Sequence, residues 1–342
     1  MARERIVSGN QTQPDEDQAF VSLRPKSLDE YIGQNELRGK LQVTLEASRQ
    51  RKESVEHILF YGPPGLGKTT LAHIIAHEMG TKMVATAGPA LQRTGDLMGI
   101  LTNLNEGDIL FIDEIHRLSP VIEEFIYPAM EDFKVDFVVD KGAFAKVINV
   151  PLKQFTLIGA TTRAGLLSAP LRDRFGLYYH LDFYPPEELA RIAERSARIL
   201  GTTIPTDAAG AIAERARGTP RIANRLLRRV RDYADVKNDG AITAKIAGKA
   251  LDAEGIDNLG LDALDRKFLQ VIIEYYKGGP VGVEALAATL NEELDTLVDM
   301  VEPYLLKTGF VRRTKRGRMA SSEAAKHLGL NIPDPGSQQR LL

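Results

Sequence analysis

The stretch Gly62-Pro63-Pro64-Gly65-Leu66-Gly67-Lys68-Thr69-Thr70 fits the phosphate-loop pattern G-x-x-x-x-G-K-[ST] at every fixed position. The apolar run at 57–61 before it predicts a buried strand. The spacing of apolar residues at 71–79 predicts a helix that ends at Gly80. A strand, a glycine-rich loop and a helix in this order direct backbone N–H groups and a helix N-terminus at a phosphate. The stretch therefore predicts a nucleotide-binding α/β core.

Each fixed residue of this loop has a task in holding a phosphate. Gly62, Gly65 and Gly67 let the backbone wrap closely around a β-phosphate. Lys68 supplies a cation for the β and γ oxygens, and Thr69 offers a hydroxyl to Mg²⁺. We therefore expect a nucleotide and Mg²⁺ as cofactors.

Composition limits the class of protein. A chain of 342 residues is too long for one ordinary core, so two or three domains are expected. The net charge of −2 means that any nucleic-acid site must come from a local cluster of cations. The absence of cysteine excludes disulfides and thiolate metal sites. Because the sequence contains no run of about 18 apolar residues and no signal-peptide core, we expect a soluble cytoplasmic protein.

Changes in the predicted secondary structure along the chain indicate the domain boundaries. Strand and helix patterns alternate up to Tyr184-Pro185-Pro186, which indicates a parallel sheet covered by helices. One of these helices, over 90–104, is expected to break at Gly95 and Gly99. The predicted segments are a flexible N-terminus (1–18), an α/β domain (19–184) with an inserted hairpin (about 134–151), a small all-α domain (185–255), a winged-helix domain (256–330) and a flexible tail (331–342).

Polar side chains follow two apolar strands of the predicted sheet. Asp113 and Glu114 end one strand and Thr161 and Thr162 end another, so they should meet the phosphate loop at one sheet edge. Asp113 would lie near Mg²⁺, and Glu114 would orient a water for attack on the γ-phosphate. The alternative, that the two acids cap a helix, is the weaker one behind a full phosphate loop. The threonines either sense the γ-phosphate or cap a helix before Arg163, and topology favours the sensor.

Three arginines are candidates for the phosphate charge. Arg172 and Arg174 stand just before a strand, and arginine suits the spread charge of a phosphoryl transition state. Either one would act on a neighbouring subunit's nucleotide, which requires a ring or dimer; a surface pair with Asp173 is the alternative. Arg221 follows Gly218-Thr219-Pro220 at the start of a helix in the small domain. It would reach the γ-phosphate when the two domains close.

The predicted wing carries five cations within seven residues and no acid among them. Such a run is either a solvated face or a phosphate-backbone contact. No base-reading side chains accompany it, so we expect DNA binding by shape and charge. The five cations are Arg312, Arg313, Lys315, Arg316 and Arg318.

Two further segments have two interpretations each. Residues 20–34 mix apolar and turn residues, and they either bury an adenine or form an ordinary docking loop. The hairpin at 134–151 has more apolar residues than one buried face needs. It either folds onto its own domain or docks a partner.

Together these motifs resemble the RuvB family of Holliday junction branch migration motors, within the AAA+ ATPases. GPPGLGKT and LFIDEIHRL (110–118) mark the wider class. The resemblance covers about 19–330, and Thr161-Thr162 agrees with the RuvB subgroup where many AAA+ proteins have asparagine. The narrower resemblance depends on the inserted hairpin, the winged-helix tail, RPKSLDEYIGQ (24–34), IGATTRAG (158–165), APLRDRFG (169–176) and GTPRIANRLLRRVRD (218–232).

The resemblance implies an α/β AAA+ P-loop ATPase domain, a small helical lid and a winged-helix head. It implies an ATP- and Mg²⁺-dependent motor that migrates Holliday junctions in DNA recombination and repair. The motor would be a hexameric ring that pulls duplex DNA with the partner RuvA, and with the resolvase RuvC in a larger complex. The alternatives are a clamp-loader-like or protein-remodelling ATPase and a slow ATP-dependent binding switch.

The resemblance also assigns residues. Arg174 would be the arginine finger acting in trans, and Arg221 the second sensor. Val147, Ile148 and Val150 would dock RuvA, and Arg313 and Arg318 would touch DNA. Catalysis would involve Asp113, Glu114, Thr161, Thr162 and Arg174, with Thr69 and Asp113 on Mg²⁺. The nucleotide would contact Leu23, Arg24, Tyr31, Ile32, Gly62, Gly65, Gly67, Lys68, Thr69, Thr70, Glu131, Asp132, Phe133, Tyr184 and Arg221.

Overall fold

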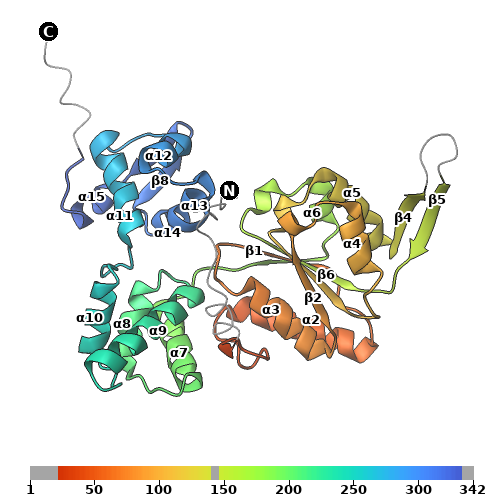
Figure 1. Ribbon diagram of the computed structural model, residues 1–342, viewed down its shortest axis with the longest axis horizontal. Coiled ribbons are helices and arrows are strands. Elements are labelled where there is room, and N and C mark those ends of the chain that lie inside the picture. Colours follow the sequence, from red (N-terminus) through yellow and green to blue (C-terminus); the bar gives the residue numbers. More distant parts are fainter. Residues whose placement is uncertain (1–21, 140–145, 333–342) are drawn as a thin grey trace, which may run out of the picture.

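The centre of the P-loop domain is a parallel sheet with the strand order β2-β3-β6-β1-β7 (Figure 1). The strands of this sheet are continuous apolar runs in the sequence because both faces of the sheet are buried under helices. The register places Tyr61 beside Thr161, and the Gly62 N–H donates to the Thr161 carbonyl. The strands are β1 (Ile58–Tyr61), β2 (Met83–Ala87), β3 (Ile109–Asp113), β6 (Thr156–Thr161) and β7 (Leu177–His180). The computed structural model describes residues 22–139 and 146–332.

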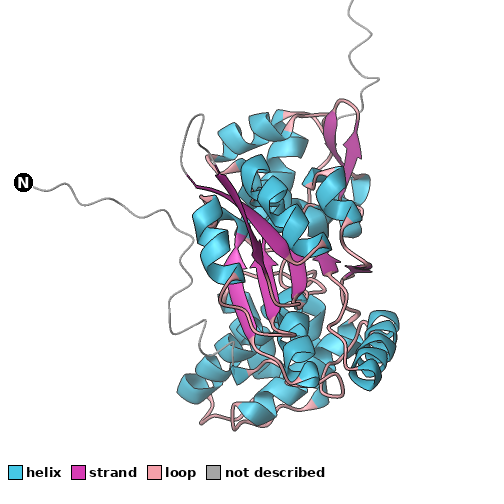
Figure 2. Ribbon diagram, turned by 90° about the vertical axis from the view of Figure 1, so that its right-hand side faces the viewer, coloured by secondary structure: helices cyan, strands magenta, loops and turns pink. Residues whose placement is uncertain are grey.

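Helices cover both faces of this sheet (Figure 2). Alternate strand residues face opposite ways, so Ile58 and Phe60 pack with one group of helices while Leu59 packs with the other. The first group consists of α2 (Asn35–Arg51) and α3 (Lys68–Met79). The second consists of α4 (Thr94–Leu101), α5 (Pro120–Glu131) and α6 (Ala169–Asp173).

The helix expected over 90–104 does not break at its glycines. A 3-10 turn, η1 (Gly88–Ala90), comes first, and α4 then runs through Gly95 and Gly99. A glycine inside a helix costs about 1 kcal/mol. Burial of Leu97 and Leu101 against the domain core offsets that cost.

The small domain and the head lie on the same side of the P-loop domain (Figure 1). The small domain is all helical, as its sequence predicts. It contains α7 (Pro186–Ile199), α8 (Thr206–Arg215), α9 (Pro220–Lys237) and α10 (Ala244–Ala253). The head contains α11 (Ala263–Gln270), π-helical η4 (Val271–Tyr275), α12 (Val283–Leu290), α13 (Leu294–Thr296), π-helical η5 (Leu297–Val301), α14 (Glu302–Lys307), β8 (Val311–Thr314), β9 (Gly317–Ala320) and α15 (Ser322–His327).

The inserted hairpin projects from the P-loop domain, away from the lid and the head (Figure 1). It pairs β4 (Lys134–Val139) with β5 (Lys146–Pro151) in antiparallel register. At its base Val135 is fully buried in the domain core, whereas Ile148 is 49% exposed. The base of the hairpin is therefore packed into the domain core, and the apolar side chain of Ile148 on β5 is exposed to solvent. The tip of the predicted hairpin (140–145), the N-terminal stretch 1–18 and the tail from 333 lie outside the described residues.

No helix in the described ranges 22–139 and 146–332 is long and apolar enough to span a membrane.

A buried ion pair joins the small domain to the head. Arg217, directly before Gly218-Thr219-Pro220-Arg221, donates to Asp265 Oδ2 at 2.7 Å and to the Met300 carbonyl at 2.9 Å. Asp265 is fully buried, and its Oδ1 has no hydrogen-bond partner among the residues that the structure describes. Burial raises the pKa of Asp265 to about 7, although Arg217 opposes the shift. A proton on Oδ1 would disturb no existing hydrogen bond.

This pair predicts a pH dependence of stability. The folded pKa of Asp265 exceeds the ordinary value of about 3.9, so the folded state binds more protons between these two values. The contribution of Asp265 to stability is therefore present at low pH and is lost as pH rises from about 4 to about 7. Asp265→Asn should reduce this fall, measured by calorimetric unfolding across that pH range. The matched control Asp252→Asn removes an exposed carboxylate bonded to Arg215 and should leave this fall in stability unchanged. An equal dependence of stability on pH in the wild type and in Asp265→Asn would contradict the raised pKa of Asp265.

Candidate functional site

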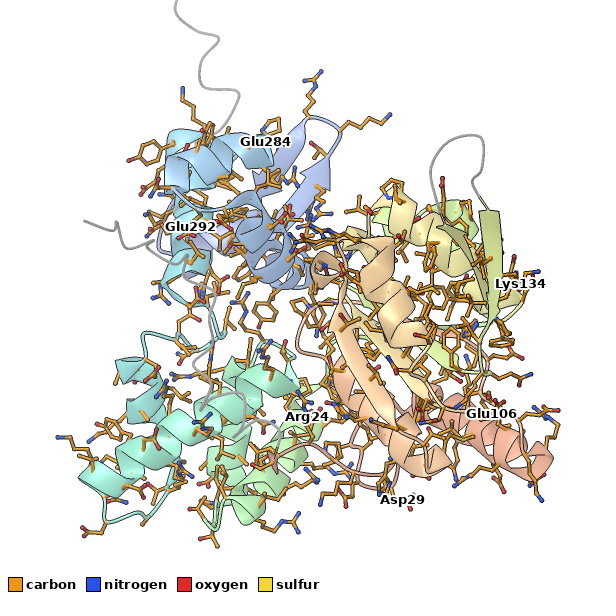
Figure 3. The ribbon with its side chains drawn as sticks, turned by 45° about the vertical axis from the view of Figure 1, so that its right-hand side comes forward. Arg24, Asp29, Glu106, Lys134, Glu284 and Glu292 are labelled. Carbon is orange, nitrogen blue, oxygen red and sulfur yellow. The ribbon has the colours of Figure 1, made fainter. Side chains whose placement is uncertain are left out.

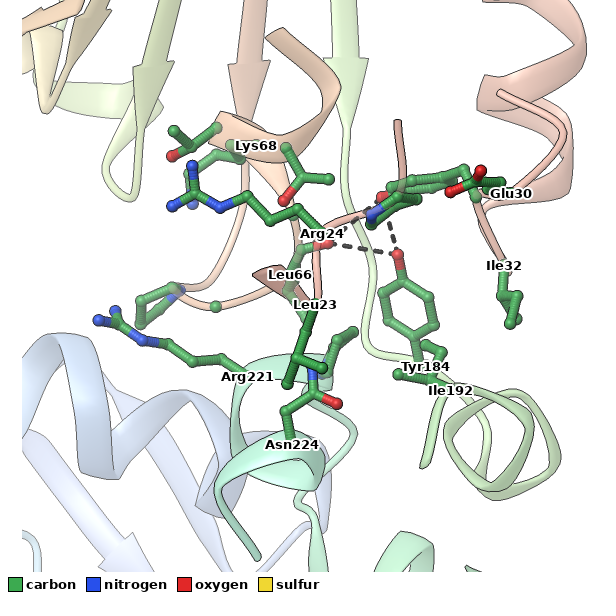
Figure 4. A pocket seen from close by; sticks show the side chains of 18 of the residues that line it. Leu23, Arg24, Glu30, Ile32, Leu66, Lys68, Tyr184, Ile192, Arg221 and Asn224 are labelled. Carbon is green, nitrogen blue, oxygen red and sulfur yellow. Dashed lines mark hydrogen bonds between the residues drawn. The ribbon is translucent and has the colours of Figure 1, made fainter. Parts of the chain in front are cut away.

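A cavity of about 390 Å³ lies where the phosphate loop, the N-terminal segment and the lid meet (Figure 4). The side chains of Arg24 and Arg221 extend toward the same side of it as Lys68 (Figure 4). Arg24 lies at the junction of the P-loop domain and the lid (Figure 3). The predicted residues that line the cavity are Leu23, Arg24, Tyr31, Ile32, Gly65, Gly67, Lys68, Thr69, Thr70, Asp113, Glu114, Thr162, Tyr184 and Arg221.

Lys68 begins α3 and is held by the loop that precedes it. Its Nζ donates to the carbonyls of Gly62 at 2.7 Å and Pro63 at 2.9 Å. Burial lowers its pKa to about 8, while the charges of Asp113 and Glu114 oppose the shift. The lysine is thus a partly desolvated cation at a helix N-terminus, which is the place where a phosphate binds.

The phosphate loop packs closely against the lid at Gly65. Gly65 has a φ of 78°, and a Cβ there would lie 2.7 Å from Thr219 Cγ2 and 3.1 Å from Arg221 Cβ. The Arg221 N–H also donates to the Gly65 carbonyl at 3.4 Å. Only glycine accommodates both the left-handed backbone and this contact. The start of α9 therefore rests directly on the phosphate loop.

Two tyrosines close the other side of the loop. The Tyr31 and Tyr184 hydroxyls are hydrogen-bonded to each other at 2.8 Å and lie 3.4 and 3.3 Å from the Leu66 carbonyl, so one hydroxyl donates to the other, which donates to this carbonyl. Figure 4 draws these bonds beside Leu23 and Ile32. Burial raises the pKa of both phenols, so they remain neutral donors. The arrangement places part of this segment, within residues 23–32, in the cavity wall.

The carboxyl ends of β3 and β6 meet at one edge, as the sequence predicts. Thr162 lines the cavity, and its hydroxyl donates to Glu114 Oε2 at 3.4 Å. Thr161 is fully buried, and its hydroxyl accepts from the Arg163 N–H at 2.9 Å. Burial raises the pKa of Glu114, with Asp113 adding to the shift. Of the two threonines, only Thr162 is therefore placed to meet a ligand in this cavity.

The residues present fit a magnesium ion. Thr69 and Asp113 line the same cavity and offer a hydroxyl and a carboxylate. Asp113 Oδ1 accepts the Glu114 N–H at 2.9 Å, while Oδ2 has no hydrogen-bond partner among the described residues. Mg²⁺ takes oxygen ligands and usually keeps several waters, so two protein ligands and a phosphate suffice.

Sequence reasoning missed Arg195, which lines the cavity from the small domain. Arg195 lies on α7 and donates to the Leu23 carbonyl at 2.9 Å and to Glu30 Oε2 at 2.8 Å. Asn224 of α9 and Ile192 of α7 also line the cavity. A possible signal was the periodicity of α7, which places Ile192 and Arg195 three residues apart on one face. The contacts themselves join residues more than 160 positions apart.

Several predicted residues do not line this cavity. Arg174 lies beside Glu131 instead, with its Nη2 3.1 Å from Glu131 Oε1 and its guanidinium 4.2 Å from the Tyr127 ring centroid. Phe133 packs edge-on against Phe155. The predicted residues absent from the cavity lining are Gly62, Glu131, Asp132, Phe133, Thr161 and Arg174.

The five cations of the wing have two kinds of surroundings: two bind a buried carboxylate and three are exposed. Arg313 and Arg318 donate to Glu302, a fully buried carboxylate on α14, at 2.5 and 2.7 Å. Burial raises the pKa of Glu302, but the hydrogen bonds of the two arginines outweigh it and leave the pKa lowered. Arg312, Lys315 and Arg316 are exposed and have no side-chain partner among the described residues.

Models of known protein families match the whole described architecture. Residues 23–181 match the Holliday junction DNA helicase RuvB P-loop domain, 184–257 match the RuvB AAA lid domain, and 258–329 match the RuvB C-terminal winged-helix domain.

The chain belongs to the RuvB family.

Solved structures agree with this assignment. The Thermotoga maritima RuvB Holliday junction branch migration motor is 51% identical, with a TM-score of 0.85 over 91% of this chain and 100% of that chain. Two substitution variants of that protein match with the same identity and TM-score over 91% of this chain and 99% and 100% of theirs. The resemblance and the fold class predicted from the sequence are thus confirmed.

The head contacts the P-loop domain just after β6. Arg163, directly after Thr161-Thr162, donates through Nε and Nη2 to the two oxygens of Asp299, both at 2.7 Å. It also donates to Asp295 at 2.8 Å. These hydrogen bonds raise the pKa of Arg163, which remains a cation. The head is therefore bonded to the residue that follows the first-sensor pair.

We predict that Arg195→Ala weakens ATP binding about tenfold, which corresponds to about 1.4 kcal/mol. The reason is that Arg195 holds Leu23 and Glu30 in the cavity wall, while the residues that face the γ-phosphate stay in place. Calorimetric titration with a slowly hydrolysed ATP analogue measures the change. Arg191→Ala, an exposed arginine on the same helix, is the matched control. Equal affinity of both variants would remove Arg195 from the site.

Proposed function

We propose that this chain is an ATP-driven motor that promotes branch migration of Holliday junctions in recombination and repair. It would act in the cytoplasm as a hexameric ring, with RuvA at the junction and RuvC in a larger complex. The observation that carries this proposal is the position of Arg174. Arg174 is ion-paired with Glu131 outside its own chain's cavity, although Lys68, Glu114, Thr162 and Arg221 line that cavity.

The cavity residues support ATP hydrolysis by positioning and charge stabilisation. Lys68 and Arg221 would hold the terminal phosphates, and Thr69 and Asp113 would hold Mg²⁺. Bound Mg²⁺ would neutralise charge on the β and γ oxygens. Glu114 would accept a proton from the attacking water, because its Oε1 has no hydrogen-bond partner among the described residues and is available to that water.

A trans role for Arg174 explains why it and Glu131 lie together. Two neighbouring copies arranged in a ring would place this pair at the edge of the next copy's cavity. The predicted nucleotide contacts at Glu131, Asp132 and Phe133 would then be contacts across the subunit boundary. Arginine delivers a delocalised charge to a phosphoryl transition state, so the site would be complete only in the assembly.

The wing supports binding to the DNA backbone. Arg312, Lys315 and Arg316 extend their charges into solvent from a two-stranded ribbon. Contacts of this kind attract duplex DNA without reading its sequence. Arg313 is half exposed and would contact DNA as well as donate to Glu302, whereas Arg318 is 19% exposed and would contribute less to DNA binding.

The hairpin supports a docking role for RuvA. Ile148 presents an apolar side chain on the projecting strand β5, and such a side chain gains from burial against a partner. Val150 is partly buried against the domain core, so its contribution is divided between the fold and a partner. The side chain of Val147 lies outside what the structure describes.

We predict that Arg174→Ala and Glu114→Gln, each inactive alone, regain ATP turnover when mixed. An Arg174→Ala subunit keeps its Glu114 and would receive Arg174 from a Glu114→Gln neighbour. Steady-state phosphate release with DNA present measures the recovery. Arg172→Ala, which replaces an exposed arginine two residues away, should retain nearly wild-type turnover.

Absence of recovery, with mixed assembly shown by native mass spectrometry, would refute the trans finger. It would favour an ATP-dependent binding switch over a ring motor.

We also predict that replacing Arg312, Lys315 and Arg316 by alanine weakens binding to duplex and junction DNA. The slope of log K against log salt should fall by about 0.9 for each lost phosphate contact. Fluorescence anisotropy at several salt concentrations measures both quantities. The control replaces Lys237, Lys245 and Lys249, exposed lid lysines with the same total charge.

Arg318→Ala should behave differently, because it removes a hydrogen bond from a buried carboxylate. We expect a loss of head stability of about 2 kcal/mol. If the triple variant unfolds the head or leaves the salt slope unchanged, the division of the wing into two sets of cations is wrong.

A further inference from the structure

We propose that His116 is a positioning residue for ATP hydrolysis, which holds Glu114 in place by donating its Nδ1 hydrogen to Glu114 Oε2. The inference rests on the role proposed above for Glu114. His116 lies in η2 (Ile115–Arg117), between the end of β3 and α5. Its Nδ1 lies 2.9 Å from Thr161 Oγ1 and 3.2 Å from Glu114 Oε2. One ring nitrogen therefore faces both the buried sensor threonine and the carboxylate that would activate water.

The imidazole has little access to solvent. Its side chain is 7% exposed, so an unpartnered Nδ1 would carry a desolvation cost. Burial, with the charge of Arg163 as the next cause, lowers the pKa of His116. The ring is thus neutral near pH 7 and carries a single N–H.

The position of that hydrogen decides which neighbour His116 holds. With the hydrogen on Nδ1, the ring donates to Glu114 Oε2, and Thr161 keeps its own hydroxyl hydrogen for another acceptor. With the hydrogen on Nε2, Nδ1 accepts from the Thr161 hydroxyl and gives Glu114 nothing. Thr161 Oγ1 is already fixed in place by the Arg163 N–H at 2.9 Å. The Nδ1 atom therefore bonds either to Glu114 or to the Thr161 hydroxyl, and not to both in one arrangement.

Glu114 needs such an anchor because of its backbone. Its φ of 47° is in the left-handed region, which is uncommon for a residue with a side chain. The other hydrogen bond to its carboxylate is a 3.4 Å contact from Thr162, also to Oε2. Anchoring Oε2 leaves Oε1 free to take the proton of water. A displacement of about 1 Å at a reacting group costs on the order of 10²-fold in rate.

The test compares three replacements of His116. Asparagine places a polar atom close to the position of Nδ1, glutamine places one close to Nε2, and alanine places none. We expect His116→Asn to keep most of kcat, and His116→Gln and His116→Ala to lower kcat on the order of 10-fold to 10²-fold. KM for ATP should change less than about twofold, since the phosphate-binding residues are intact. His180→Gln, an exposed histidine on β7, is the matched control and should behave as wild type.

A second measurement separates positioning from folding. In the Glu114→Gln background, His116→Gln should cause no further loss of single-turnover rate, because both changes act through the same carboxylate. Thermal unfolding of each variant checks the fold.

Equal loss in His116→Asn and His116→Gln, a change in KM with kcat intact, or additive loss in the double variant would overturn the proposal. Full activity of Glu114→Gln would instead overturn the proposed role of Glu114. Inactive Glu114→Gln with fully active His116→Gln and His116→Ala would refute only the positioning role.

Discussion

The contact at Gly65 is the constraint on which the nucleotide site depends. Thr219 and Arg221 occupy the space where any other residue would place a Cβ, so the lid meets the backbone that wraps the phosphate without an intervening side chain. Movement of α9 would therefore move Arg221 and Asn224 relative to the phosphate loop. The lid helix α7 carries Arg195, which holds the opposite wall through Leu23. The lid is thus a structural part of the cavity on both of its sides.

Two arginines extend this arrangement to the head. Arg163 follows the first-sensor pair and binds Asp299, while Arg217 precedes the second-sensor segment and donates to the carbonyl of Met300. Asp299 and Met300 are consecutive residues of η5 in the head. A single short segment of the head is therefore bonded beside both predicted sensors. Bidentate and buried arginine contacts are geometrically specific, so the position of the head is tied to the shape of the site.

The parts of the site that consist of contiguous motifs could be predicted from the sequence. The phosphate loop, the acids after β3 and the threonines after β6 are contiguous motifs, and parallel topology alone brings them to one edge. It did not predict contacts between residues far apart along the chain, such as Arg195 with Leu23 or Arg163 with Asp299. The break expected in α4 failed for the same reason, because packing against the sheet overrides the weak local preference of glycine.

The wing shows why counting charges in a sequence overstates a binding surface. A two-stranded ribbon is marginally stable by itself, and β8 with β9 has four residues in each strand. Arg313 and Arg318 face each other across this ribbon and converge on Glu302, which is bonded through both of its oxygens. A buried carboxylate left without these partners would be costly. Two of the cations thus hold the ribbon against the head, and this anchoring gives Arg312, Lys315 and Arg316 a fixed surface from which to meet a phosphate backbone.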